Sequence, residues 1–215
     1  MKDYSLVMAL VDFLPVAFFT AAGVLLMRDL YNKMSKGAFA LFAAGLIDVT
    51  CAGALKALYK LLYAAGLCDF TPLSEMFFPV QSIGFLLAGL GILAMLTHRQ
   101  DRRTYAAVPP VFRGTFVFVS LMVLGLGMLD AVLCVLAGRL KKPGLIPLFL
   151  LSFLCSLAMG CLSSRDFARA SMNWIAEGVN AAGQGSLLAG AVLLHNNGLA
   201  ALRPEQSENV SCELH

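Results

Sequence analysis

Charged residues are scarce in this chain of 215 residues, since Asp, Glu, Lys and Arg together make up only 13% of it. A soluble domain usually carries about 25% charged residues, because its surface must interact with water. Hydrophobic residues reach 59%, and the mean hydropathy is +0.79. The composition therefore excludes an ordinary soluble domain. It predicts an integral membrane protein, which we expect in a bacterial plasma membrane.

Several sequence signatures of chemistry are also missing. The six cysteines form no C-x-x-C pair and no cluster with histidine at metal-ligand spacing. There is no phosphate-binding loop, no nucleophile elbow and no zinc-protease or dinucleotide-binding motif. The net charge of +3 includes no long basic run, which argues against nucleic-acid binding. We therefore expect no metal, no cofactor and no nucleic-acid partner, and the sequence favours a role other than catalysis.

What the chain does contain is a series of apolar segments, each near or above the ~20 residues that a helix needs to cross a bilayer. The segments cover residues 5–27, 37–62, 76–97, 111–137, 144–162 and 172–195. Short connectors with charged residues, proline or glycine separate them. The sequence thus predicts an all-α bundle of six transmembrane helices over residues 1–202 and a polar C-terminal tail at 203–215. The expected partners are the lipid bilayer, an unidentified small molecule or ion, and a second copy or a partner subunit.

Faint similarity links the two halves of the chain. Phe42 and Gly53 in the second segment match Phe149 and Gly160 in the fifth. Each half holds three helices, and an odd number of crossings makes two successive halves run in opposite directions. The pattern therefore predicts a 3+3 inverted repeat, which is typical of transporters with a binding site at the repeat interface. The proposed half-repeats are residues 1–97 and 111–195.

Orientation follows from the distribution of Lys and Arg among the connectors. If the N-terminus lies outside, the inner connectors hold slightly more of these residues than the outer ones. Cytoplasmic connectors of membrane proteins are enriched in Lys and Arg. We therefore expect both termini outside.

The last apolar segment carries a stripe of polar side chains. On a helix, Asn173, Glu177, Asn180 and Gln184 fall on one face. A carboxylate and three amides are costly in contact with hydrocarbon, so the stripe is expected to face other helices or a cavity. These residues are candidates for ligand binding. Trp174 is a further candidate for stacking on a ligand, although an anchor at the membrane interface is the more ordinary role for it.

Small residues recur every four positions beside the stripe, at Gly178, Ala182, Ser186 and Gly190. Such a ridge lets the backbone of a neighbouring helix approach closely. We therefore expect this face to pack tightly against another helix of the bundle.

Two polar residues in the first half could complete the same binding site. Gln81 lies about one and a half turns into the third segment, and the sequence repeat aligns it with Glu177. Asp48 lies near the centre of the second segment, where a carboxyl group should be paired or protonated. Lys56 and Lys60, further along the same segment, are interpreted as side chains that extend to the membrane interface.

Other ionisable residues in apolar segments are candidates for proton or ion coupling. Asp12 precedes Pro15, which favours a kink because it removes a backbone donor. Asp130 lies in the fourth segment, and His195 ends the sixth on the side of the polar stripe. The candidates for coupling are Glu177, Asp48, Asp12, Asp130 and His195.

The function that these observations favour is transport of a polar or amphiphilic small molecule or an ion. The site would be lined by the third and sixth segments, with Glu177 binding a cation or a donor group. Two alternatives remain open at this point. One is a sensor or complex subunit that binds a ligand without transporting it, and the other is a membrane-embedded enzyme acting on a lipid or quinone, with acidic residues and His195 as acid–base groups.

Overall fold

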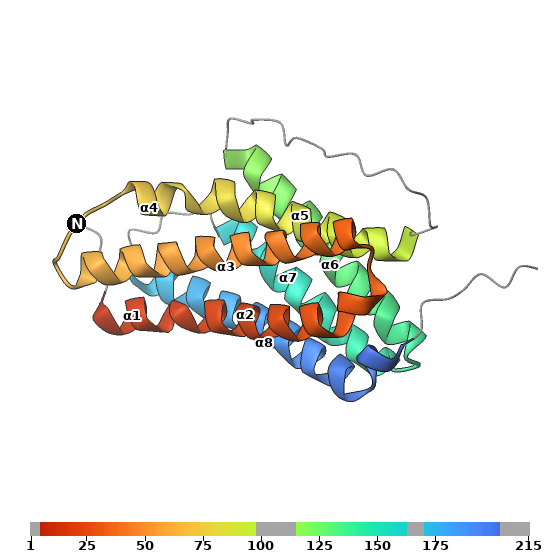
Figure 1. Ribbon diagram of the computed structural model, residues 1–215. Coiled ribbons are helices and arrows are strands. Elements are labelled where there is room, and N and C mark those ends of the chain that lie inside the picture. Colours follow the sequence, from red (N-terminus) through yellow and green to blue (C-terminus); the bar gives the residue numbers. More distant parts are fainter. Residues whose placement is uncertain (1–4, 98–114, 163–169, 203–215) are drawn as a thin grey trace, which may run out of the picture.

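The computed structural model describes residues 5–97, 115–162 and 170–202, and every regular element in this part of the chain is a helix. The long helices are α2 (Phe13–Leu30), α3 (Lys36–Ala64), α5 (Phe77–Thr97), α6 (Thr115–Arg139), α7 (Ile146–Leu162) and α8 (Ala170–Asn196) (Figure 1). The short elements are α1 (Leu6–Val11), α4 (Pro72–Glu75), η1 (Tyr31–Lys33), η2 (Pro143–Leu145) and η3 (Leu199–Ala201). The prediction of an all-α fold is confirmed for the described residues. The tail at 203–215 lies outside them.

Within the described residues, five helical stretches are long and apolar enough to cross a membrane. They cover Leu6–Lys33, Lys36–Ala64, Pro72–Leu96, Val117–Arg139 and Pro143–Leu162. These stretches support an integral membrane protein. Helix α8 has 27 residues and sufficient length, but its polar stripe lowers its hydropathy. Its role as a sixth membrane span is therefore still a prediction.

The first membrane stretch breaks where proline predicts it. Helix α1 ends at Val11 and α2 begins at Phe13, with Asp12 between them. Pro15 has no backbone N–H to donate to the carbonyl group of Val11, four residues earlier. The interruption is one residue long and Asp12 keeps helical backbone angles, so the kink itself is still a prediction. The side chain of Asp12 is buried inside the bundle.

The six long helices pack in a closed ring, in which each contacts the next along the chain and α8 returns to contact α2. Fully buried aromatic side chains, including Phe42, Phe85 and Phe149, fill its core. Glycines allow the closest approaches. A Cβ atom on Gly125 of α6 would lie 2.3 Å from the backbone carbon of Phe85 on α5, so only glycine fits there without a shift of the backbone.

Helices α5 and α6 run in the same direction. Ser82 donates a hydrogen bond of 2.7 Å to the carbonyl oxygen of Phe118. Further along both helices, Gly89 meets Gly125 and Met128. Residue numbers therefore rise together along the two helices. The connection between the two helices, residues 98–114, lies outside the described residues.

The same relation holds for α2 and α8. Phe18 meets Gly185, and Asp29 bonds to His195, so these two helices are also parallel. Both three-helix halves consequently run in the same direction, and the predicted inversion of the repeat is corrected. The start of α1 and the end of α8 lie at opposite ends of the bundle (Figure 1). The terminal residues themselves lie outside the described residues, so the expectation of both termini outside is still a prediction.

Contacts within the first half recur in the second half. Each contact joins a glycine to a residue on the preceding helix. The corresponding pairs are Gly53–Val16 with Gly160–Val119, Gly84–Asp48 with Gly183–Cys155, and Gly91–Phe42 with Gly190–Phe149. The difference in residue number is the same for all three pairs of α3 and α7 residues. It is also the same for both pairs of α5 and α8 residues. In this register Asn180, rather than Glu177, corresponds to Gln81.

The small-residue ridge predicted on α8 packs differently from the expectation. Gly178 and Ala182 are exposed, and no atom lies within 4 Å of the position that a Cβ on Gly178 would take. The close contacts of α8 with α7 are instead made by Gly183 and Gly190. Helix α8 therefore packs against α7 through a different face from the predicted ridge. Of the four ridge residues, only Gly190 also lies on the face that contacts α7.

Candidate binding pocket

A buried lysine joins two acidic residues from distant parts of the chain. Lys60 Nζ on α3 lies 2.7 Å from Glu177 Oε1 on α8 and 3.1 Å from Asp12 Oδ1. All three side chains are at most 7% exposed. We call these three residues the charge triad. Moving a charged group out of water costs several kcal/mol. The attraction between the ammonium group of Lys60 and the two carboxyl groups offsets part of that cost.

The triad lies near the end of the bundle where α1 begins and α3 ends. Asp12 is about two helical turns from Leu6, and Lys60 is about one turn from Ala64. Glu177 is about two turns from the start of α8 at Ala170. Charged side chains at this depth are less costly than at the bilayer centre, because they are closer to the interface.

A pocket of about 40 Å³ adjoins the triad between α2, α3, α5 and α8. Its polar lining consists of Asp12, Thr50, Lys56, Gln81, Asn180 and Gln184. Apolar side chains, including Phe19, Val49 and Phe77, complete it. A cavity needs about 10–15 Å³ of such volume for each water molecule, so this one has room for about three.

Three oxygen atoms of pocket residues are buried without a hydrogen-bond partner in the described part of the protein. They are Asp12 Oδ2, Gln81 Oε1 and Gln184 Oε1. Glu177 Oε2, behind Lys60, is in the same condition. A buried polar atom without a partner costs about 1–3 kcal/mol, so such atoms are rare unless water or a ligand contacts them. The pocket can therefore accept several hydrogen bonds.

The pocket also holds a second cation. Lys56 Nζ lies 4.0 Å from the centre of the Phe77 ring, and both residues line the pocket. The described residues provide no carboxylate within ion-pair distance of Lys56, although Asp12 and Glu177 act on it through their charge. Its ammonium group is thus held by the face of an aromatic ring and remains available to an anionic group.

The polar stripe of α8 faces the interior of the bundle. Asn173, Glu177 and Gln184 are buried, and Asn180 and Gln184 line the pocket with Gln81. Glu177 does not line the pocket and is paired with Lys60 beside it. The structure does not bring Trp174 to this site, since its side chain is 44% exposed on the outer face of α8.

Asp48 was expected to complete the site, but it lies elsewhere. It packs against Gly84 on α5, is half-buried, and is not part of the pocket lining. The break between α1 and α2 provides Asp12 in its place. The reason is the helical repeat, which directs Val49, Thr50, Gly53 and Lys56 of α3 into the pocket and turns Asp48 towards α5.

The remaining candidates for coupling lie outside the pocket. Asp130 of α6 is 3% exposed. The buried hydroxyl group of Ser152 on the neighbouring α7 is within hydrogen-bonding reach of its carboxyl group. These two residues correspond to no polar pair in the first half of the bundle.

His195 lies at the opposite end of the bundle from the triad. Its Nδ1 atom is 2.8 Å from Asp29 Oδ2, and Arg28 Nη2 lies 2.7 Å from Nε2. Lys33 donates hydrogen bonds to the carbonyl oxygens of Ala200 and Leu202. These contacts connect the end of α2 with the end of α8. The structure therefore gives His195 a position at a helix junction and separates it from the other candidates.

Lys60 and Lys56 are residues of this candidate site that sequence reasoning misses. The sequence predicts side chains that reach the membrane interface, whereas Lys60 is buried in the triad and Lys56 lies over the ring of Phe77. One signal could have indicated this arrangement. The apolar segments hold several acids, and lysines four residues apart on one helix face are natural partners for two of them.

Comparisons of the chain with protein-family models, with curated proteins and with solved structures each find no significant match.

Proposed function

We propose that this protein is a small membrane carrier that binds a small polar molecule in the pocket between α2, α3, α5 and α8 and moves it across the bilayer. The observation that carries the proposal is the set of buried, unpartnered oxygens around a cavity inside a bundle of apolar helices. Intramembrane polar groups are costly, and they commonly mark a substrate or ion pathway. The size of the pocket favours a small polar ligand over an amphiphilic one, since sites for drug-sized molecules are about 300–1,000 Å³.

Two similar three-helix units, related by an axis along the bundle, are part of this proposal. The recurring glycine contacts support them. Parallel repeats of this kind occur in transporters, where the two units rock against each other around a central site. The pocket is lined by α2, α3 and α5 of one unit and α8 of the other, so relative movement of the units would open or close it.

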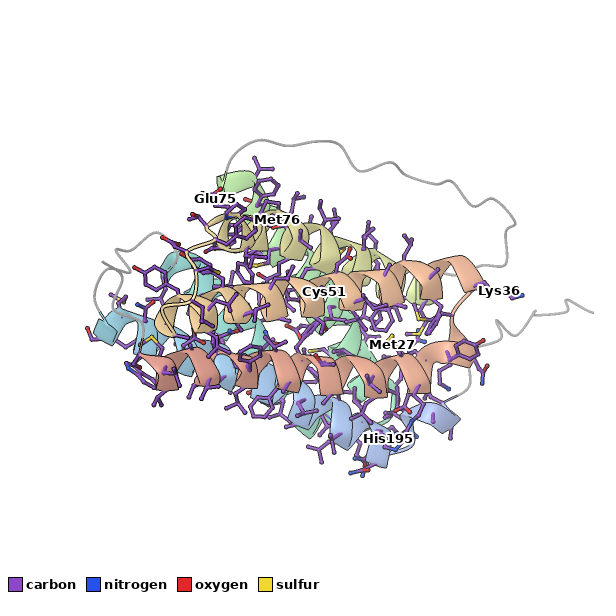
Figure 2. The ribbon with its side chains drawn as sticks, turned by 60° about the vertical axis from the view of Figure 1, so that its left-hand side comes forward. Met27, Lys36, Cys51, Glu75, Met76 and His195 are labelled. Carbon is purple, nitrogen blue, oxygen red and sulfur yellow. The ribbon has the colours of Figure 1, made fainter. Side chains whose placement is uncertain are left out.

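We also infer which end of the bundle faces the cytoplasm. One end carries six cationic side chains in the described residues, namely Arg28, Lys33, Lys36, Arg139, Lys141 and Lys142. The described residues at the other end carry only Lys56 and Lys60, which take part in the site. Figure 2 shows Lys36 and His195 at one end and Glu75 at the other. The positive-inside rule then assigns the cationic end to the cytoplasm, with the pocket nearer the outer surface.

Uptake by the purified protein in liposomes tests this proposal. Candidate solutes are first ranked by the thermal stabilisation that they give the protein in detergent, because a ligand that binds only the folded state raises its stability. Uptake of the best solute is then compared between the wild type, Asp12→Asn and Gln184→Leu. Glu75→Gln is a matched control, since it also converts a carboxylate to an amide but lies exposed on α4.

The proposal predicts that both pocket variants lose most of the uptake and that Glu75→Gln retains it. Stabilisation by the solute without uptake would favour the sensor or subunit alternative. Uptake or stabilisation that is unchanged in both pocket variants would overturn the assignment of the pocket.

A further inference from the structure

One acidic and one basic side chain, Asp12 and Lys56, line the pocket, and this pairing restricts its ligand. Lys60 and Glu177 are not part of the lining and are paired with each other. A ligand with a net charge would leave this poorly hydrated site with an uncompensated charge, which is costly. A ligand with one positive and one negative group would match the two charged side chains of the lining.

One side of the pocket offers oxygen atoms that can accept hydrogen bonds from a cationic group. Asp12 lines the pocket and its side chain is 6% exposed. Lys60 contacts Oδ1, and no described residue donates a hydrogen bond to Oδ2. The side-chain oxygen of Gln184 is likewise buried and unpartnered. An ammonium group has three donors and no acceptor, so it matches such acceptors.

Another part of the pocket presents an available cation. Lys56 lines the pocket without an ion pair to any described residue, and its nearest aromatic partner is Phe77, at 4.0 Å. The attraction of a cation to an aromatic ring is smaller than the cost of removing that cation from water. A carboxylate placed beside Lys56 would supply the missing countercharge.

We propose that the ligand of this pocket is a small zwitterion, with its ammonium group on Asp12 and its carboxylate on Lys56. This inference rests on the proposed function of the pocket as a ligand site. The pocket has room for about three water molecules. Covalently bonded atoms lie closer together than neighbouring waters, so a molecule of about five non-hydrogen atoms fits. Glycine is the smallest amino acid of this kind.

Three probes separate the two charged groups of the ligand. Glycine carries both, methylamine carries only the cation, and acetate carries only the anion. Binding of each to the purified full-length protein is measured by calorimetry and by thermal stabilisation. We expect glycine to bind at least tenfold more tightly than either single-charge probe.

Charge-removing variants then assign each group of the ligand to a residue. In Lys56→Gln the preference for glycine over methylamine should fall to less than threefold, while Lys56→Arg should retain it. In Asp12→Asn the preference for glycine over acetate should fall in the same way. Lys36→Gln, which removes an exposed lysine at the other end of the bundle, is the control and should change neither ratio. Size-exclusion profiles and helix content by circular dichroism confirm that each variant is folded.

The outcomes distinguish the two proposals. Equal binding of methylamine and glycine, or of acetate and glycine, would overturn the zwitterion while leaving the pocket as a ligand site. Preferential binding of an uncharged polar molecule that depends on Gln184 would do the same. If binding of every ligand is insensitive to Asp12, Lys56 and Gln184, both proposals fall.

Discussion

Lys60 and Glu177 are 117 positions apart in the chain, yet their side chains meet at 2.7 Å inside the bundle. This contact joins α3 to α8, and through Asp12 it also includes the break between α1 and α2. The same contact leaves the second oxygen of each carboxylate without a partner. One lysine therefore stabilises three helices and also determines which atoms the pocket can offer to a ligand.

Replacing Lys60 with methionine should destabilise the protein strongly. The variant leaves Asp12 and Glu177 buried without a shared cation, and breaking a buried ion pair on one side costs about 3–5 kcal/mol. Thermal unfolding in detergent, followed by circular dichroism, measures the loss. Lys36→Met provides the comparison, because Lys36 lies in the first turn of α3 and outside the triad. The triple variant Lys60→Met, Asp12→Asn, Glu177→Gln should recover part of the loss, since it removes all three charges. No recovery would contradict an electrostatic origin.

The sequence was sufficient to predict the helices and the inward direction of the polar stripe. Periodicity predicts both, because it depends on residues within one helix. Asn173, Glu177 and Gln184 are buried as expected. The partner of Glu177 was not predictable in this way. It depends on which helices are neighbours around the ring, and no local pattern in α8 contains that information.

Asp12 and Asp48 illustrate the same limit. Both are acids in apolar segments, and Asp48, nearer the centre of its segment, is the stronger candidate from sequence. The structure brings Asp12 to the pocket because its face of the helix is turned towards α3 and α8, and it leaves Asp48 beside Gly84. The direction of the second half was misjudged for a comparable reason. Alternation of helices assumes that each connector stays on one side of the membrane, whereas the contacts of Ser82 and Gly89 with α6 make α5 and α6 parallel.

Glycine substitutions test the close contact between α5 and α6. Gly125→Ala should destabilise the protein by about 1–3 kcal/mol, because the new methyl group would lie 2.3 Å from the backbone of Phe85 and the helices would have to separate. Gly178→Ala is the matched control, since nothing lies within 4 Å of its Cβ position. Alanine is favoured over glycine in a helix by about 1 kcal/mol, so this control should be neutral or slightly stabilising. Thermal unfolding compares the two. Equal effects would be inconsistent with a tight α5–α6 contact.

Labelling of single cysteines by a membrane-impermeant reagent tests the direction of the two halves. Cys68, which is exposed after α3, serves as one site in a variant whose other cysteines are replaced. Asn32→Cys and Lys142→Cys, each combined with removal of Cys68, report on the turns after α2 and α6. The structure predicts that positions 32 and 142 are labelled from the same side, and position 68 from the opposite one. Labelling of 68 and 142 from one side would instead support strict alternation and an inverted repeat.

Asp130 provides a test of a buried carboxyl group outside the pocket. The carboxyl group is buried, and the hydroxyl group of Ser152 is within hydrogen-bonding reach of it. Asp130→Asn keeps the shape and can keep the contact with Ser152 while it removes the ionisable group, so it should raise the unfolding temperature. If Asp130 also couples ion or proton movement to transport, the same variant should lose uptake while it gains stability. Functional residues are often retained although they lower the stability of the protein. Asp69→Asn is the control, because Asp69 lies in a connector and bonds to Tyr59. A decrease in stability for Asp130→Asn would show that the carboxylate has a stabilising partner, and unchanged uptake would remove Asp130 from the candidates for coupling.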